Sequence, residues 1–287
     1  MREQRSEIVG KVLRAVWEKN YETNKALIQQ TPPFIQTVAK GTDCRPCVAV
    51  GAGPSRLKNI HKLDPELYDI IACDKVVPEL IQLGITPTYI VALNAASTDV
   101  RKWLEPAVNK SILVMPCGVH PDTYEGWRLE LVRFINNSLA TELNLRIESE
   151  LGLPTYVIGS NAGTFAYLLG VYSMHNPVAY IGMDFSFTSR RAVIEYQDPR
   201  KYNVIEMTDL WKGEETRFTD LGWWDMVLAY QEWVKVYKEY WGIRTINCTE
   251  GGVNYSQYCE SMSLDEFSEM LRGKGGETVA ESKWDII

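Results

Sequence analysis

Short apolar runs alternate along the chain with longer segments whose apolar side chains recur at helical spacing. The runs predict strands at 47–50, 67–73, 89–93, 111–115, 155–158, 178–181 and 243–248. Nearly continuous apolar strands separated by helices are typical of a parallel sheet covered on both faces. We therefore expect an α/β fold with a doubly wound, mainly parallel sheet and flanking N- and C-terminal helices. The strands expected at its centre are 47–50, 89–93, 155–158 and 178–181.

The helical segments are marked by apolar spacing and by residues that begin or end helices. One face of residues 6–30 carries Val9, Val12, Leu13, Val16 and Trp17. The Thr31-Pro32-Pro33 sequence ends this segment. Further helices are expected at 76–83, 164–175 and 223–241. Ser263 and Glu266 form a capping box, which predicts a C-terminal helix.

Two segments depart from this alternation. Residues 122–150 combine helical spacing with an Asn136-Asn137-Ser138 interruption, so we interpret them as an insertion of undefined form. Residues 187–222 are polar and predict a long excursion or lid. The expected organisation is an N-terminal helical segment at 1–44, an α/β domain with this lid at 45–252, and a C-terminal helix and tail at 253–287.

Composition narrows the class of protein. The chain has 287 residues, 45% of them hydrophobic and 23% charged, which is typical of a globular protein. A net charge of −7 excludes a general basic surface for nucleic acid. The six cysteines are scattered, and Cys44 and Cys47 form the one C-x-x-C pair, with no second pair at zinc spacing. Cys47, Cys73 and Cys117 lie in or beside apolar strand-like runs, so we expect buried free thiols there and a reducing, cytoplasmic compartment. Neither a secretory signal nor an apolar run of about 18 residues is found, so no membrane span is expected.

The stretch after the first predicted strand suggests a phosphate site. Gly51 and Gly53 let the backbone turn sharply, and Pro54 opens a helix-compatible segment that includes Ser55. A helix N-terminus offers free N–H groups to an anion, so these groups predict a phosphate cradle. A plain tight turn is an equally good interpretation. The third glycine of the dinucleotide fingerprint is missing, because Arg56 stands in its place.

Other candidate residues follow the remaining strands. Ligands of open α/β sheets bind beyond the carboxyl ends of the strands, and a second glycine turn at 159–163 falls there too. Two such turns facing one crevice would hold a phosphate chain and its sugar. The candidate nucleotide- and phosphate-binding residues are Gly51, Gly53, Ser55, Asp74, Asn94, Gly159, Ser160, Asn161, Gly163, Arg190 and Arg191.

Two further residues are candidates for catalysis. His120 follows a strand in a Gly- and Pro-containing turn, and a histidine there can act as a general base. We expect His120 to be the base, with Asp184 as the alternative base or a positioner of the acceptor; Asp184 could also bind a ribose hydroxyl or a metal. The alternatives remain open: His120 as a surface residue, and Asp184 as a cap for local N–H groups.

Several motifs taken together resemble one known group of proteins. They are Gly51–Ser55, Ile85–Val91, Gly159–Gly163 with its helix, Tyr180–Asp184 and Ile246–Gly252. In this order they are similar to the superfamily of 6-hydroxymethylpterin diphosphokinase MptE-like proteins and motility-associated flagellin glycosyltransferases. The first turn also resembles the nucleotide-binding turn of a bacterial sialyltransferase family that uses CMP-sugars. The resemblance spans about residues 20–260.

The resemblance implies a Rossmann-like core and transfer from a nucleotide-linked donor to a hydroxyl acceptor. One branch moves a sugar, for flagellin a nonulosonic acid from its CMP form; the other moves diphosphate from ATP to a pterin alcohol with Mg²⁺. The segment at 246–252 and the N-terminal helix look more like the glycosyltransferase branch. Asn94 stands where much of the family has an acid, which weakens the Mg²⁺-dependent alternative, and no metal residue is assigned. A nucleotide-binding module without catalysis is a third alternative. The sequence also leaves the oligomeric state open, and an oligomer is possible.

Overall fold

A computed structural model describes residues 2–34, 45–96, 99–137, 141–159, 161–192, 204–211, 213 and 215–273. Its centre is a nine-stranded sheet in the order β11-β10-β7-β1-β2-β3-β4-β5-β6, and every neighbouring pair is parallel. The strands are β1 Cys47–Val50, β2 Asp69–Cys73, β3 Tyr89–Val91, β4 Ile112–Pro116, β5 Val132–Asn137, β6 Thr155–Tyr156, β7 Val178–Ile181, β10 Thr245–Asn247 and β11 Glu260–Ser261.

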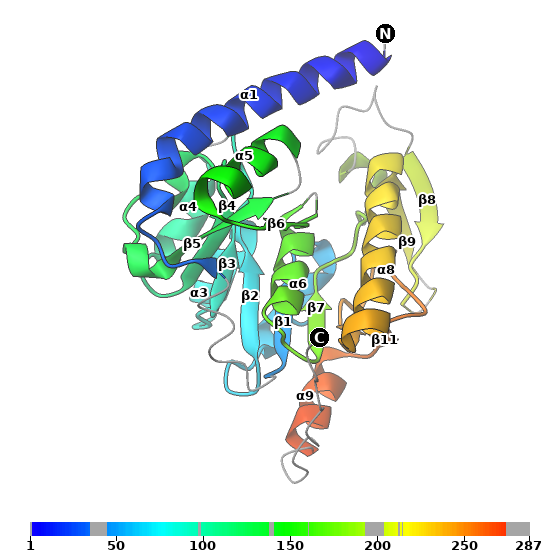
Figure 1. The fold of residues 1–287 in the computed structure, drawn as a ribbon. Helices are drawn as coiled ribbons and strands as arrows, with labels where there is room; N and C mark the ends of the chain where they lie inside the picture. Colours follow the sequence, from blue (N-terminus) through cyan, green and yellow to red (C-terminus); the bar gives the residue numbers. More distant parts are fainter. Residues whose placement is uncertain are drawn as a thin grey trace.

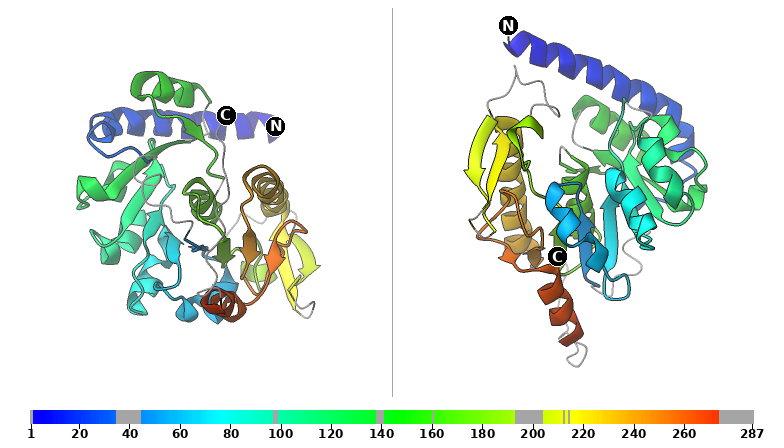
Figure 2. Two further views of the ribbon diagram at one scale, coloured as in Figure 1. Left: turned by 60° about the horizontal axis from the view of Figure 1, so that its bottom comes forward. Right: turned by 180° about the vertical axis from the view of Figure 1, so that it is seen from behind.

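Helices cover both faces of this sheet, which confirms the predicted fold class (Figure 1). The α-helices are α1 Arg2–Ile28, α3 Val77–Gln82, α4 Val100–Leu104, α5 Thr141–Leu151, α6 Ala162–Tyr172, α8 Leu221–Trp241 and α9 Leu264–Gly273. Short 3₁₀ turns include η1 Pro54–Lys58, η2 Ile60–Lys62, η3 Asp74–Val76, η4 Glu105–Ala107, η5 Pro121–Tyr124 and η6 Leu129–Leu131. Helices α6 and α8 lie on the face seen in Figure 1, and η1 and α3 lie on the face that Figure 2 shows from behind.

The chain reverses its direction across the sheet once. It adds β2 to β6 in order on one side of β1, and then returns through α6 to place β7 on the other side of β1. The strand predicted at 155–158 is therefore not central: β6 holds two residues and forms an edge. The prediction was wrong because the long crossover through α6 carries the chain from this edge back to the middle of the sheet.

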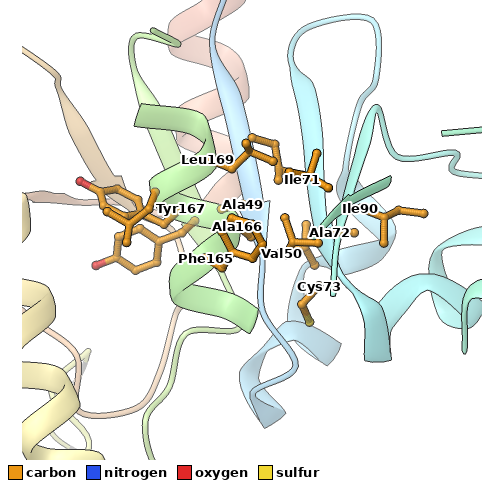
Figure 3. Packing of buried hydrophobic residues seen from close by; sticks show 14 of the residues in the cluster. Ala49, Val50, Ile71, Ala72, Cys73, Ile90, Phe165, Ala166, Tyr167 and Leu169 are labelled. Carbon is orange, nitrogen blue, oxygen red and sulfur yellow. The ribbon is translucent and has the colours of Figure 1, made fainter. Parts of the chain in front are cut away.

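Helix α6 forms the centre of the core. It packs on β1 and β2 with Phe165, Ala166 and Leu169, which are fully buried (Figure 3). Gly170 allows this close approach, since a β-carbon there would lie 2.7 Å from the Cys47 sulfur. Packing of helix on sheet at this density leaves no room for another side chain, so the start of α6 is rigidly placed relative to the end of β1.

The insertion at 122–150 is a regular part of the sheet. It supplies β5 and α5, and the Asn136-Asn137 pair interpreted as an interruption lies inside β5. Asn136 is fully buried, and its amide donates hydrogen bonds to the carbonyl oxygens of Asn144 and Leu153, both at 3.0 Å. Buried polar groups are stable when they are paired in this way, which the sequence pattern does not reveal.

Two buried amides fix helix α1. Asn20 donates to the carbonyl oxygens of Ala95 and Gly118, at 2.8 and 3.0 Å, and Asn24 donates to those of Cys117 and Val119, both at 2.9 Å. These carbonyls belong to the loops that follow β3 and β4. Helix α1 therefore crosses the edge of the sheet where the strands end (Figure 1).

The capping box confirms the predicted start of the C-terminal helix. Ser263 N donates to the Glu266 carboxylate at 2.7 Å, and Glu266 N donates to the Ser263 hydroxyl at 3.2 Å. No helix in the described part of the chain combines the length and apolarity of a membrane span. Cys47, Cys73 and Cys117 are buried free thiols, as predicted for these three. Cys248 is also free and buried, Cys259 is free and half-buried, and Cys44 lies outside the described residues.

Part of the segment predicted as a lid is a hairpin held by a buried ion pair. Strands β8 Val204–Thr208 and β9 Thr216–Asp220 pair antiparallel, while 193–203 lie outside the described residues. Arg217, which is 2% exposed, donates through Nε to the buried Asp209 carboxylate at 2.7 Å. The same carboxylate accepts the Gly252 N–H at 2.9 Å, so the pair joins the hairpin to the loop after β10.

Replacing Arg217 by alanine should strongly destabilise the protein. The change leaves the Asp209 carboxylate buried without its cation, and breaking a buried pair in this way costs about 3–5 kcal/mol. Chemical denaturation would measure the loss. Arg244→Ala is the matched control, because its pair with Glu260 is partly exposed and should cost under about 1 kcal/mol. Equal losses of unfolding free energy in the two variants would contradict the conclusion that the Arg217–Asp209 pair holds the hairpin in place.

Candidate functional site

A pocket of about 560 Å³ opens at the carboxyl ends of β3, β2, β1 and β7. It lies where the strand order reverses between β1 and β7, which is the usual ligand position in open α/β sheets. Its lining residues are Gly51–Pro54, Cys73–Lys75, Leu93, Asn94, Trp103, Asn161–Gly163, Gly182–Phe187 and Trp223. The fold thus brings together Gly51, Gly53, Asp74, Asn94, Asn161, Gly163 and Asp184 of the predicted site.

Two backbone turns interlock on the floor of this pocket. Gly53 N donates to the Gly182 carbonyl at 2.8 Å, and a β-carbon on Gly53 would lie 2.6 Å from that oxygen and 2.1 Å from the Asp184 carboxylate. Gly182 has φ +64°, and a β-carbon there would lie 2.4 Å from the Gly51 carbonyl oxygen. These glycines are therefore required by the contact between the ends of β1 and β7.

Asp184 lies between these turns. It is 1% exposed, and its carboxylate accepts the Ser55 hydroxyl at 2.5 Å and the Ser55 N–H at 3.1 Å. Gly252, from the loop after β10, packs against its backbone, and a β-carbon there would lie 2.5 Å from the Asp184 Cα. Burial raises the pKa of Asp184 to about 6, although the hydrogen bonds from Ser55 oppose the rise.

The N–H groups expected to cradle a phosphate are already used. Those of Gly51, Gly53 and Ser55 donate to the Ile181 carbonyl, the Gly182 carbonyl and the Asp184 carboxylate. The segment after the turn is the five-residue 3₁₀ turn η1 and not an α-helix. The prediction that these groups face a phosphate is thus corrected: the turn's donors hold β7 in place.

The start of α6 offers anion-binding groups instead. Asn161 is its N-cap, and the Asn161 side-chain oxygen accepts the Thr164 N–H at 2.9 Å. Ala162 and Gly163 follow in the first turn, where N–H groups have no carbonyl partner within the helix. Gly163 lies against the first glycine turn, since its β-carbon would lie 3.6 Å from the Gly51 Cα. An anion in the pocket would therefore meet the positive end of an 11-residue helix.

A second buried carboxylate belongs to Asp74, at the end of β2. It is 6% exposed, and its Oδ1 accepts the Lys75 N–H at 2.8 Å. Its Oδ2 accepts no hydrogen bond from any residue that the structure describes. Burial raises the pKa of Asp74 to about 6, against the effect of Lys75. Asp74 thus keeps one carboxylate oxygen for a ligand, and the second oxygen of Asp184, Oδ2, accepts only the Ser55 N–H, at 3.3 Å, among the described residues.

Aromatic side chains stand at both ends of the pocket. Trp103, from α4, lies at the β2–β3 end, with the Lys75 ammonium 5.4 Å from its ring centre. Trp223, at the start of α8, lies at the β7 end and packs edge-on against Phe185 and Phe187. Phe185 has φ +49°, an uncommon conformation for a bulky residue that is often found at functional sites.

The other predicted residues lie outside the pocket lining. Ser55 is buried beneath Asp184, and Gly159, with φ +73°, shapes the turn before α6. Arg190 and Arg191 are exposed, on the segment after the β7 loop. Ser160 lies outside the described residues.

His120 is also separate from the pocket lining. Its Nδ1 accepts the Asp122 N–H at 3.3 Å, so in the neutral ring Nε2 carries the proton and neither nitrogen is free to take one from a substrate. Its backbone N–H donates to the Asn94 carbonyl at 3.2 Å, which fixes the loop that lines the pocket.

Sequence reasoning missed Lys75, Trp103 and Trp223 as pocket residues. Lys75 directly follows Asp74 after a predicted strand, which is a usable signal. Trp103 and Trp223 carry no such signal, because only the folded structure shows whether an aromatic side chain lines a pocket or belongs to the core.

The described pocket residues offer no full set of protein ligands for a Mg²⁺ ion, so a bound Mg²⁺ would take most of its oxygen ligands from substrate phosphates and water. In the described ranges, no three His, Cys, Asp or Glu side chains are grouped to share a metal. Asp184 is engaged by Ser55, and Mg²⁺ requires a near-octahedral set of oxygen ligands. The remaining side-chain ligands for Mg²⁺ would be the Asp74 carboxylate and the Asn94 amide, which is a weaker ligand than a carboxylate.

Comparison with known families gives a match over more than half of the chain. A family model described as 6-hydroxymethylpterin diphosphokinase MptE-like matches residues 17–190, which include the Gly51 turn, the start of α6 and Asp184. Comparison with curated protein sequences gives no match.

Solved structures include one of similar fold. The MAf glycosyltransferase from Magnetospirillum magneticum AMB-1 superposes with a TM-score of 0.61 at 15% sequence identity. The match covers 80% of this chain and 36% of that one, so the present chain corresponds to about a third of the larger protein. At this identity the similarity concerns the fold.

Gly53→Ala should destabilise the protein. The added methyl group meets Asp184 and the Gly182 carbonyl, and forced overpacking costs about 1–3 kcal/mol or more. Denaturant titration measures the change. Gly273→Ala, where no atom lies within 4 Å of the new methyl group, is the control and should be nearly neutral.

Asp74→Asn should stabilise the protein at neutral pH. The folded-state pKa of Asp74 is raised, so the charged form disfavours folding once pH exceeds about 6, by up to about 3 kcal/mol. Below about pH 4 the carboxyl is protonated in both states and the advantage of the variant should vanish. The measurement is the free energy of unfolding across this pH range, with the exposed Asp225→Asn as control. If the difference in unfolding free energy between Asp74→Asn and the wild type were the same at neutral pH as below pH 4, the raised pKa of Asp74 would be contradicted.

Proposed function

The chain belongs to the 6-hydroxymethylpterin diphosphokinase MptE-like family, and from this premise we propose that it is a transferase that uses a nucleotide-linked donor. We favour a glycosyltransferase that moves a sugar from a nucleotide-sugar, of the CMP-nonulosonate type, to a hydroxyl acceptor. One observation carries the proposal: the first turn of α6, whose N–H groups have no carbonyl partner within the helix, lines the pocket at the strand-order reversal, with Gly163 against the Gly51 turn.

In the proposed reaction the bond between the sugar's anomeric carbon and the donor phosphate breaks, and a bond from that carbon to the acceptor oxygen forms. The phosphate leaves with the bonding electrons, and the N–H groups of Ala162 and Gly163 stabilise its charge. Arg190 or Arg191, on the segment after β7, is proposed to neutralise the phosphate further. The acceptor proton passes to a base.

Asp184 is the proposed base, with His120 as the alternative. Asp184 lines the pocket, and a carboxylate whose pKa burial raises to about 6 is suited to take a proton near neutral pH. His120 is disfavoured because its Nδ1 accepts the Asp122 N–H and its side chain is not part of the pocket lining.

Sugar transfer is preferred to diphosphate transfer because of the residue after β3. Asn94 offers an amide where a carboxylate would serve Mg²⁺, and the pocket lacks a matching ligand set in its described residues. The similar fold of a glycosyltransferase agrees with this preference. The family description supports diphosphate transfer from ATP as the alternative, and a non-catalytic nucleotide-binding module is the second.

Ligand-dependent melting against CMP, UDP, GDP and ATP tests the donor class. A ligand that binds the folded state alone raises the melting temperature, and its stabilisation grows with the logarithm of its concentration relative to its Kd. We expect CMP to stabilise the protein. Stabilisation by ATP together with a pterin alcohol, and not by CMP, would favour diphosphate transfer. The absence of a shift with every nucleotide would contradict the proposed function.

Asp184→Asn should slow consumption of a CMP-sugar about 10²–10⁴-fold, because this is the usual effect of removing a general base. His120→Ala should change the rate little. Turnover of labelled donor measures the rates, and CMP affinity and melting temperature are measured in parallel to separate catalysis from folding. The reverse order of the two variants would identify His120 as the base.

A further inference from the structure

The polar groups of the pocket are distributed unevenly along the sheet edge. Because β3, β2, β1 and β7 are neighbours in this order, the pocket has a β2–β3 end and a β7 end, with the start of α6 between them. The β2–β3 end contains Asp74, Asn94 and Trp103. At the β7 end, Phe187 and Trp223 present rings, and the carboxylate of Asp184 is held by Ser55.

Asp74 is equipped to accept hydrogen bonds from a ligand. Its Oδ1 is fixed by the Lys75 N–H, and Oδ2 accepts none from the described residues while the side chain lines the pocket. A carboxylate buried to this degree is costly unless hydroxyl or amide donors complete its hydrogen bonding. Neighbouring hydroxyls of a sugar are such donors.

The spacing of the strands relates this carboxylate to the anion position. Asp74 follows β2, and the Gly51 turn follows β1, the adjacent strand. Adjacent strands lie about 4.8 Å apart. One nucleoside can bridge this distance, with its phosphate at the start of α6 and its ribose hydroxyls at Asp74. Trp103 then borders the space beyond the ribose, where an aromatic ring can contact a base.

We infer that the nucleoside of the donor lies at the β2–β3 end of the pocket, with its ribose hydroxyls bound by the Asp74 carboxylate. This inference rests on the proposed function and adds to it the orientation of the donor and a determinant of sugar specificity. The transferred group then points toward the β7 end, where Phe187 and Trp223 surround the space left for the acceptor.

The test compares ribonucleotides with their deoxy forms. CMP, 2′-deoxy-CMP and 3′-deoxy-CMP are titrated by calorimetry into the wild-type chain, Asp74→Ala and Asp74→Asn. At least one deoxy form should bind the wild-type chain about tenfold more weakly than CMP, the effect of one hydrogen bond to a charged group. In Asp74→Ala the preference should disappear. Asp74→Asn keeps an oxygen for the Lys75 N–H and guards against loss of folding, and it should show a reduced preference.

Asp265→Ala removes an exposed carboxylate on α9 and should retain the full preference. Equal binding of CMP and both deoxy forms by the wild-type chain would overturn the orientation while leaving nucleotide binding intact. If a folded Asp74→Ala variant kept the preference for CMP over its deoxy forms, another residue would bind the ribose hydroxyls, and the inference would be overturned equally. Failure to bind CMP would be followed by ATP and its deoxy forms, and failure with both series would overturn the proposed function itself.

Discussion

The close backbone contact between the ends of β1 and β7 is the constraint on which the site depends. Gly53 donates to the Gly182 carbonyl, and Asp184 fills the space that a side chain on Gly53 would need. Ser55 and Gly252 enclose Asp184 from two other parts of the chain. With this contact in place, α6 can begin directly against the first turn, and the residues at its start line the pocket.

The arrangement explains why the glycine pattern departs from the dinucleotide fingerprint. In that fingerprint, a third glycine lets the helix after the first strand pack closely on the turn. Here the segment after β1 is a short 3₁₀ turn, and Arg56 at this place pairs with Glu79. Gly163, on α6, approaches Gly51 instead. The helix that closes on the first turn thus comes from a distant part of the sequence.

The apolar runs were sufficient to predict the parallel sheet, most of its strands and the edge at which the pocket opens. They did not predict that β6 is an edge strand, because strand order depends on the path of α6 and not on local pattern. Nor did they reveal β5, whose Asn136 is polar yet buried, or the role of the Gly51 turn. The residues of that turn were identified, but the partners of their N–H groups belong to β7 and the loop that follows it, and only the folded chain brings them together.

The same dependence governs when the site comes into existence. The hydrogen bond between Ser55 and Asp184 joins residues 129 positions apart, and β1 has β7 as a neighbour only after β2 to β6 and α6 have been made. Contacts of such long sequence separation form late, because a long loop must close before they can stabilise anything. During synthesis, the part of the chain that precedes β7 carries the first glycine turn without its partner. The pocket is therefore complete only in the finished fold, and the proposed nucleotide would stabilise the finished domain without helping the part before β7 to form.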